Sequence, residues 1–289
     1  MRILILAFII FPMKTYLNET FDFNDSNLIS TLDELSLWSA PFGMKLLDTI
    51  KIRKNINILD IGFGTGFPLL ELAQRFGNTC QISGIDPWLE AIDLTKRKIE
   101  QYGIKNVRII KGVAEKIPCD DNLFDLIVSN NGLNNVTDQK KAYSECFRLC
   151  KSDGQMVFTF NLPDTMIEFY HVFENVLHDF KLFEEIDKMK THVKSKRKTI
   201  EETQEMLANT GFKTEKIITD SFMWRYADGT TMLNHYFIKL AFLGAWKKII
   251  KLPDLPLVFN EIEKRLNKIA LEKGEFDLTI PYAVFDCRK

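Results

Sequence analysis

Short apolar runs alternate with longer stretches of helical periodicity through residues 56–160 of this chain. Such runs suit strands that are buried on both faces, and the helical stretches suit the crossovers that join parallel strands. The alternation therefore predicts an α/β fold with a mainly parallel sheet. The expected strands lie near residues 57–61, 81–85, 107–110, 124–129 and 155–160. The expected helices lie near residues 66–76, 89–102 and 138–150, the last closed by Asp153-Gly154.

Helical patterns dominate the segments on both sides of this core. Before it, residues 28–50 repeat apolar side chains at helical spacing, with a bend expected at Pro41 and Gly43. After it, helical patterns alternate with two strand-like runs, residues 212–222 and 278–285, which we expect to complete a seven-stranded sheet. The predicted organisation is an apolar tail (1–12), a helical lead-in segment (13–54), a core (55–162), and cap helices with the last two strands (163–289).

Composition and charge narrow the possible functions. Hydrophobic residues form 46% of the 289-residue chain and charged residues 27%, which is typical of a folded globular protein. The formal net charge of -1 gives little attraction for nucleic acid or anionic lipid, so we expect a small-molecule partner and no nucleic acid. The five cysteines have no zinc-binding spacing and form no even set, so we expect no metal site, no disulfide framework and a cytoplasmic location.

The first twelve residues imitate a secretion signal. Arg2 is followed by the apolar run of residues 3–11, which is too short to span a bilayer as a helix. No small-x-small cleavage site follows, and Met13 offers an alternative translation start. We therefore expect no stable membrane anchor.

A glycine-rich turn follows the first expected strand, with the sequence Asp60-x-Gly62-x-Gly64-x-Gly66. Missing side chains let backbone approach a ligand closely, and the helix start beyond supplies N–H groups. The spacing disfavours a dinucleotide fingerprint, whose third glycine would fall at Phe67, and no Gly-Lys-Ser/Thr follows as in a P-loop. A carboxylate at this place favours a cationic ligand over a pyrophosphate.

A second carboxylate, Asp86, ends the second expected strand and is followed by Pro87-Trp88. A carboxylate there can accept hydrogen bonds from both hydroxyls of a ribose. Alternatively, Asp86 would cap the helix expected from Leu89.

Two further elements, Gly112-Val113-Ala114-Glu115-Lys116-Ile117-Pro118 and Phe124-Asp125-Leu126-Ile127, follow in order. With them, the chain resembles class I S-adenosylmethionine-dependent methyltransferases over roughly residues 56–160, closest to the small-molecule group called type 11. The resemblance implies a Rossmann-like sheet with helices on both faces, a helical cap, and S-adenosyl-L-methionine as cofactor. It assigns cofactor binding to Asp60, Gly62, Gly64, Gly66, Asp86, Trp88, Ala114, Glu115, Asn130 and Asn131.

Within this set, the resemblance places Asp60 at the methionine portion of the cofactor and Asp86 at the ribose. Ala114 and Glu115 would lie at the adenine, with Trp88 beside it. Asn130 and Asn131 would form the floor of the site.

The acceptor is less constrained than the cofactor. Residues 130–133 read Asn-Asn-Gly-Leu where enzymes that methylate amino groups of bases or glutamine have Asn/Asp-Pro-Pro-aromatic, so a small-molecule acceptor is expected. Methyl transfer needs mainly alignment, and if a base exists, His235 or Tyr170 is the expected catalytic residue. Residues 38–43 and 225–235 are the expected substrate-side segments. The sequence leaves open the oligomeric state and whether O, N, S or C is methylated.

Two other functions stay open at this point. A noncatalytic regulatory module that binds S-adenosylmethionine would carry the same motifs, because binding motifs do not establish chemistry. A nicotinamide-dependent oxidoreductase is disfavoured by the glycine spacing.

Overall fold

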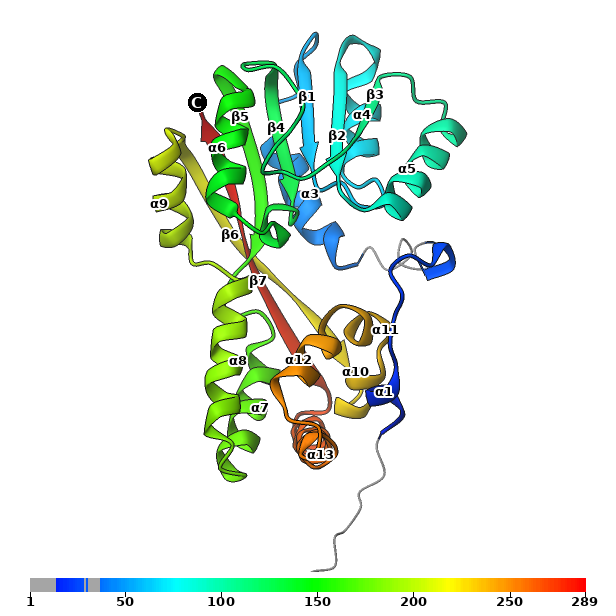
Figure 1. The fold of residues 1–289 in the computed structure, drawn as a ribbon, viewed down its shortest axis with the longest axis vertical. Coiled ribbons are helices and arrows are strands. Elements are labelled where there is room, and N and C mark those ends of the chain that lie inside the picture. The colour runs from blue at the N-terminus through cyan, green and yellow to red at the C-terminus, as the bar shows by residue number, and fades with distance from the viewer. Residues whose placement is uncertain (1–13, 29, 31–36) are drawn as a thin grey trace, which may run out of the picture. The chain divides into compact units, whose positions relative to one another are not determined.

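The computed structural model describes residues 14–28, 30 and 37–289. The predicted apolar tail, Met13 and part of the lead-in segment lie outside the described residues. The rest forms the predicted α/β fold, with a seven-stranded sheet in the order β3-β2-β1-β4-β5-β7-β6 (Figure 1). The strands are β1 (Asn57–Ile61), β2 (Gln81–Asp86), β3 (Val107–Lys111), β4 (Phe124–Asn130), β5 (Cys150–Asn161), β6 (Lys213–Tyr226) and β7 (Phe276–Arg288).

Strands β1 to β5 pair in parallel, and β7 pairs with β5 in the antiparallel direction. Strand β1 lies between β2 and β4, and four of its five residues are buried, which is why its sequence shows no polar alternation. Parallel pairing brings the carboxyl ends of β1, β2 and β4 to one edge. The strand order reverses at β1, and open α/β sheets bind ligands at such a point.

Helices cover both faces of this sheet (Figure 1). They are α3 (Ser39–Thr49), α4 (Leu69–Phe76), α5 (Leu89–Gln101), α6 (Gln139–Leu149) and α9 (Ile200–Thr210). Helices α3 and α4 lie on one face, and α6 and α9 lie on the other. Tyr143 of α6 and Leu207 of α9 are buried in one cluster with Phe158 and Phe285 of the sheet. Burial of these apolar side chains fixes the sheet whose edge carries the site.

The chain divides into two compact units. The sheet unit holds residues 22–165, 193–222 and 279–289, and the helical unit holds the described residues 14–21, 166–192 and 223–278. The elements mainly in the helical unit are α1 (Thr15–Asn18), α7 (Ile167–Asp179), α8 (Phe183–Lys196), α10 (Gly229–Asn234), α11 (Tyr236–Ile238), the π-helical turn η3 (Lys239–Leu243), α12 (Gly244–Ile249) and α13 (Leu255–Lys273). The predicted boundary at residue 162 lies near the change of unit between residues 165 and 166, but residues 193–222 and 279–289 belong with the sheet.

Two local predictions were wrong. Helix α6 ends at Leu149, and Asp153-Gly154 lies inside β5, where the register with β4 shifts and Asp153 has φ 58°. A turn residue serves a β-bulge as well as a helix end, so its type did not distinguish them. Pro41 and Gly43 do not bend a helix but lie within α3, which begins at Ser39. Proline is tolerated in a first turn because N–H groups there have no intrahelical partner.

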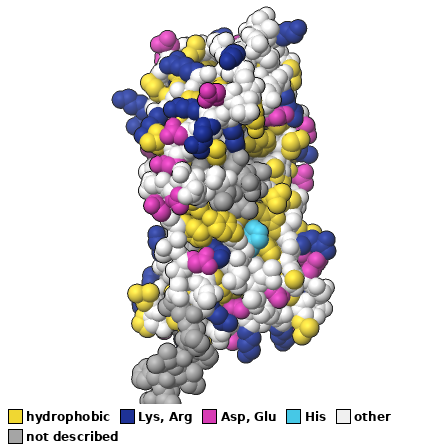
Figure 2. Space-filling model, turned by 90° about the vertical axis from the view of Figure 1, so that its right-hand side faces the viewer, with side chains coloured by type: hydrophobic (Ala, Val, Ile, Leu, Met, Phe, Trp, Pro, Cys, Tyr) yellow, Lys and Arg dark blue, Asp and Glu magenta, His cyan; other side chains and the backbone are white. Residues whose placement is uncertain are grey.

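Charged side chains of both signs are interspersed on the face shown in Figure 2. All five cysteines are free thiols. Across residues 14–28, 30 and 37–289, no helix is long and apolar enough to cross a membrane.

Candidate functional site

The glycine-rich turn carries the chain from β1 toward α4. Gly62 has φ +76°, and a Cβ atom on it would lie 2.8 Å from the Cα of Gly132. Gly64 has φ +53°, and a Cβ atom there would meet nothing within 4 Å. Positive φ disfavours other residues, and the close approach at Gly62 leaves no room for a side chain. The turn therefore presents backbone at the carboxyl edge of the sheet.

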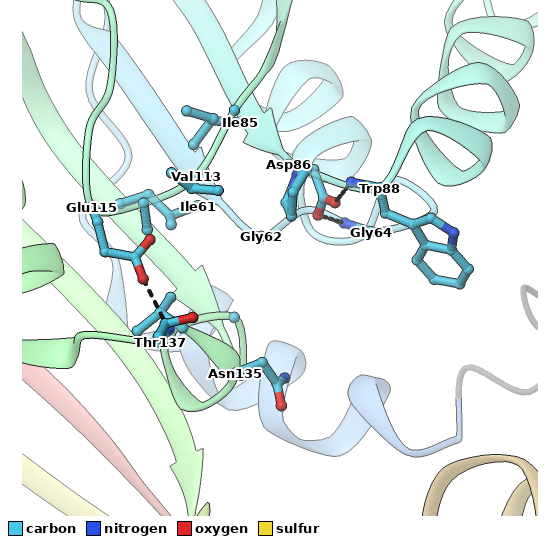
Figure 3. A pocket seen from close by; sticks show the side chains of 15 residues that line it. Ile61, Gly62, Gly64, Ile85, Asp86, Trp88, Val113, Glu115, Asn135 and Thr137 are labelled. Atoms are coloured by element: carbon cyan, nitrogen blue, oxygen red, sulfur yellow. Dashed lines mark hydrogen bonds between the residues drawn. The ribbon is translucent and has the colours of Figure 1, made fainter. Parts of the chain in front are cut away.

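Asp86 fixes the shape of this turn. Its Oδ2 accepts a hydrogen bond from the backbone N–H of Gly64 (2.8 Å), and its Oδ1 accepts one from the backbone N–H of Trp88 (2.9 Å; Figure 3). Burial raises the pKa of Asp86, and the two N–H donors oppose that rise. A carboxylate has about four lone-pair sites, so Asp86 can accept further hydrogen bonds from a ligand. Asp86 is not the cap of α5, because the N-cap position is Trp88.

Asp60 is fully buried in β1. Neither of its carboxylate oxygens has a hydrogen-bond partner among the described residues. Burial, and then the charge of Asp86, raise the pKa of Asp60 well above its ordinary range, although the nearby backbone N–H of Leu69 acts in the opposite direction. A buried polar group without a partner destabilises the fold, and such perturbed acids cluster at functional sites. Asp60 therefore indicates a ligand that supplies hydrogen-bond donors or positive charge.

A cavity of about 420 Å³ opens beside the turn. Its walls come from the ends of β1 and β2 and from the segments after β3 and β4 (Figure 3). Of the residues predicted to bind the cofactor, those that line it are Gly62, Gly64, Asp86, Trp88, Ala114 and Glu115. Those that do not line it are Asp60, Gly66, Asn130 and Asn131. The volume lies within the range of pockets that bind small ligands.

Four residues beyond Asn131 line the cavity although the sequence analysis did not predict them. They are Gly132 and residues 135–137, in the segment that follows β4. Glu115 holds this segment in place, since its Oε1 accepts hydrogen bonds from the backbone N–H groups of Thr137 (2.9 Å) and Asp138 (3.1 Å). One oxygen of Glu115 thus joins two loops. The position of this segment in the fold could have indicated its role, because it follows the carboxyl end of β4, the strand beside β1, where open α/β sheets bind ligands.

Asn130 and Asn131 differ in how their amides are used. Asn130 donates to the Ser39 carbonyl (3.0 Å) and accepts from the Thr159 hydroxyl (2.8 Å). Asn131 Oδ1 accepts a hydrogen bond from Asn134 (3.1 Å), whereas its buried Nδ2 has no partner in the part of the chain that the structure describes. Asn131 therefore retains an unused donor just beyond β4.

The two predicted catalytic residues lie in the helical unit. The centroid of the His235 ring lies 6.1 Å from that of Trp224 and 5.4 Å from that of Tyr226. Its Nδ1 is buried and has no hydrogen-bond partner within residues 14–28, 30 and 37–289. Burial lowers the pKa of His235, which keeps the imidazole neutral near pH 7. Tyr170 is buried in α7, and its hydroxyl accepts a hydrogen bond from the Trp246 indole (3.0 Å). These surroundings make Tyr170 part of the packed core and do not support its role as a base.

Other polar groups in the predicted substrate-side segment 225–235 serve the local fold. Asp228 caps α10 by accepting from the backbone N–H of Thr231 (2.6 Å). Asn234 donates to the Thr230 carbonyl of the same helix (2.9 Å). Among the described contacts, His235 is the residue of this segment whose buried side-chain nitrogen has no hydrogen-bond partner.

Comparison with known proteins decides the family. A profile of the family described as "Methyltransferase domain" matches residues 52–219, more than half of the chain. The chain belongs to the S-adenosylmethionine-dependent methyltransferase family. The predicted family is confirmed, and this result excludes the alternative of a nicotinamide-dependent oxidoreductase.

Curated relatives of this chain include enzymes named for quinone biosynthesis. The ubiquinone/menaquinone biosynthesis C-methyltransferase UbiE of Psychromonas ingrahamii is 34% identical over 136 residues, which are 45% of this chain and 54% of the relative. The demethylmenaquinone methyltransferase of Listeria welshimeri is 30% identical over 113 residues, which are 39% of this chain and 47% of the relative. The chain thus spans about half the length of the curated relatives it matches.

Solved structures confirm the predicted fold class. The YcgJ protein from Bacillus subtilis matches with a TM-score of 0.55 at 15% identity, covering 86% of this chain and 97% of that one. A SAM-dependent methyltransferase from Aquifex aeolicus matches with a TM-score of 0.52 at 20% identity, covering 67% of this chain and 92% of that one.

Proposed function

We propose that this methyltransferase binds S-adenosylmethionine beside the glycine-rich turn and transfers its methyl group to a small-molecule acceptor. One observation carries this proposal. Asp60 and Asn131 are buried with opposite unmet needs: among the described residues, the Asp60 carboxylate oxygens have no donor and the Asn131 amide nitrogen has no acceptor. They lie at the carboxyl ends of the neighbouring parallel strands β1 and β4. The methionine portion of the cofactor carries an ammonium and a carboxylate, which match these two needs.

The other end of the cavity fits a nucleoside. Asp86 keeps lone pairs for ribose hydroxyls after binding Gly64 and Trp88. The adenine would lie between the aromatic ring of Trp88, the apolar Ala114 and the polar side chain of Glu115, which all line the cavity. When bound, the cofactor supplies an electrophilic methyl group on its sulfonium. The protein's own contribution is to orient that group and exclude water from it.

We assign acceptor selection to the helical unit. Its candidate group is His235, whose neutral imidazole can take a proton from the acceptor and whose neighbours Trp224 and Tyr226 suit an aromatic molecule. The names of the relatives favour a quinone as acceptor class. We take its reduced form as the substrate, because the electron-rich ring of a quinol can attack an electrophilic methyl group. The free thiols fit a chain that works in the reducing cytoplasm.

Transfer of labelled methyl groups tests the proposal. The full chain is incubated with methyl-labelled S-adenosylmethionine and a reduced naphthoquinone that lacks a ring methyl group. We expect label in the naphthoquinol and an equal amount of S-adenosylhomocysteine. Binding of the cofactor without transfer to any quinol would contradict the acceptor class, and absence of cofactor binding would contradict the proposed activity itself.

A further inference from the structure

Trp88 lines the cofactor cavity, but part of its support comes from a distant segment of the chain. Its indole N–H donates a hydrogen bond to the backbone carbonyl of Phe23 (3.0 Å). The two rings also meet edge to face, with centroids 6.0 Å apart and planes at 61°. Both residues belong to the sheet unit. A residue 65 positions earlier in the chain thus orients one wall of the cavity.

The segment around Phe23 is held in a defined conformation. Asp22 Oδ1 accepts hydrogen bonds from both the backbone N–H and the side-chain amide of Asn24 (2.9 Å each). Asp25 Oδ1 accepts one from the backbone N–H of Asn27 (2.9 Å). Such short side-chain to backbone bonds fix turns, so Phe23 meets Trp88 from a structured turn.

Phe23 remains 46% exposed although it packs against an aromatic ring. It therefore adds little to the buried core, and both its ring contact and the hydrogen bond to its carbonyl involve the cavity-lining indole. Edge-to-face contact together with the N–H···O bond restricts the rotamers of Trp88. A preoriented ring binds a flat ligand better, because less side-chain freedom is lost on binding.

We propose that Phe23 is a positioning residue that holds the Trp88 indole as the wall on which the adenine of the cofactor packs. This inference rests on the proposed function, because it takes the cavity ligand to be S-adenosylmethionine. In this role Phe23 acts on the cofactor through Trp88. Its loss should therefore weaken cofactor binding without changing the rate of the bound enzyme.

The same segment offers a matched control. Phe21, two residues earlier, belongs to the helical unit and packs edge to face against Tyr236 (5.5 Å, 83°). Replacing Phe21 by alanine removes a ring of the same kind from the same segment without touching Trp88. The variant Phe23→Tyr keeps the ring and tests whether the aromatic contact itself matters.

Four full-length proteins are compared: the natural chain, Phe23→Ala, Phe23→Tyr and Phe21→Ala. Calorimetry gives the affinity of each protein for S-adenosylhomocysteine. The contribution of Trp88 to the fluorescence is obtained by subtracting the emission spectrum of a Trp88→Phe variant. We expect Phe23→Ala to bind about three- to tenfold more weakly, the scale of one edge-to-face contact, with a smaller change in Trp88 emission on binding. Phe23→Tyr and Phe21→Ala should match the natural chain. In methyl transfer to the naphthoquinol, Phe23→Ala should raise KM for the cofactor and leave kcat unchanged.

Equal affinity and equal emission change in Phe23→Ala would overturn the positioning role. A loss in Phe21→Ala as large as in Phe23→Ala would also overturn it, because the whole segment would then matter rather than the contact with Trp88. Failure of the natural chain to bind S-adenosylhomocysteine would instead overturn the proposed function.

Discussion

Two buried carboxylates, one in each unit, stand in opposite circumstances. Glu263 of α13 in the helical unit is 7% exposed and accepts hydrogen bonds from the Tyr16 phenol (2.8 Å) and the Thr230 hydroxyl (2.8 Å). Lys14 lies 3.5 Å away as a counter-charge. Asp60 in the sheet unit is fully buried and has no hydrogen-bond partner for either oxygen within the described residues.

The difference separates a structural acid from a binding acid. Partners from α1 and α10 satisfy Glu263, and burial raises the pKa of Tyr16, which keeps the phenol protonated as a donor. The needs of Asp60 are left for a molecule that is not part of the chain. An unsatisfied buried group destabilises the ligand-free fold, and a ligand that satisfies it gains correspondingly in affinity.

Asp60→Asn gives the largest expected effect on binding. The variant should lose about 3 kcal/mol or more of affinity for S-adenosylmethionine, because it removes the charge opposite the cofactor's cationic groups. The ligand-free variant should nevertheless be more stable than the natural chain at high pH. The folded state raises the pKa of Asp60, so the acid's contribution to stability is present at low pH and is lost as pH rises through that raised pKa.

Urea unfolding of both proteins between pH 5 and 9 measures how the difference in their free energies of unfolding changes with pH. The stability of the natural chain should fall relative to Asp60→Asn as pH rises. The opposite trend would show that Asp60 is satisfied in the free protein.

His235→Ala should lower kcat for methyl transfer by about a hundredfold, the scale for loss of a general base, with little change in cofactor affinity. Asn234→Ala is the control variant, because among the described residues the Asn234 amide donates its hydrogen bond to Thr230 of the same helix. This control should keep full activity. The natural enzyme should lose activity at acid pH, below the lowered pKa of His235, and reach a plateau near neutrality. Full turnover of His235→Ala would place proton removal elsewhere.

Glu263→Ala tests the structural role of the acid in the helical unit. Removing this acid leaves the Tyr16 phenol and the Thr230 hydroxyl without their acceptor, so the free energy of unfolding should fall by about 2–3 kcal/mol. The folded fraction should bind S-adenosylhomocysteine as tightly as the natural chain. Chemical unfolding and calorimetry on the same preparation check both statements, and a parallel loss of affinity would mean that Glu263 also serves the cofactor.

Asp86→Ala should weaken cofactor binding by about 1.5–3 kcal/mol, the scale of hydrogen bonds to a charged group. The variant also frees the N–H groups of Gly64 and Trp88, so part of this loss is a looser turn. Asp86→Asn keeps an acceptor oxygen and should lose less. Calorimetry with S-adenosylhomocysteine ranks the three proteins, and unchanged affinity in Asp86→Ala would exclude contact with the ribose.

The parts of the fold that were predictable are those with a local cause. β1 spans Asn57–Ile61 as predicted, and β4 extends one residue beyond its predicted end, because buried parallel strands need unbroken apolar runs. The glycine turn and Asp86 were identifiable because their spacing follows directly from the strand ends. Asp153 was misread because a bulge and a helix end use the same residue types.

The rest of the site depends on contacts between distant segments. Nothing in the residues near Trp88 points to Phe23, and nothing near Glu115 points to Thr137. Tyr170 was chosen for its chemistry, but packing against Trp246 commits its hydroxyl to the core. Sequence patterns give the residue types that chemistry needs, whereas burial decides which of them remain available.

Calorimetric titration of the full chain with S-adenosylhomocysteine and with NAD tests directly whether the sheet unit binds a nucleoside that carries an amino-acid ammonium group. We expect saturable binding of S-adenosylhomocysteine that is lost in Asp60→Asn, and no binding of NAD. Tight binding of NAD, or binding of S-adenosylhomocysteine that survives unchanged in Asp60→Asn, would contradict it.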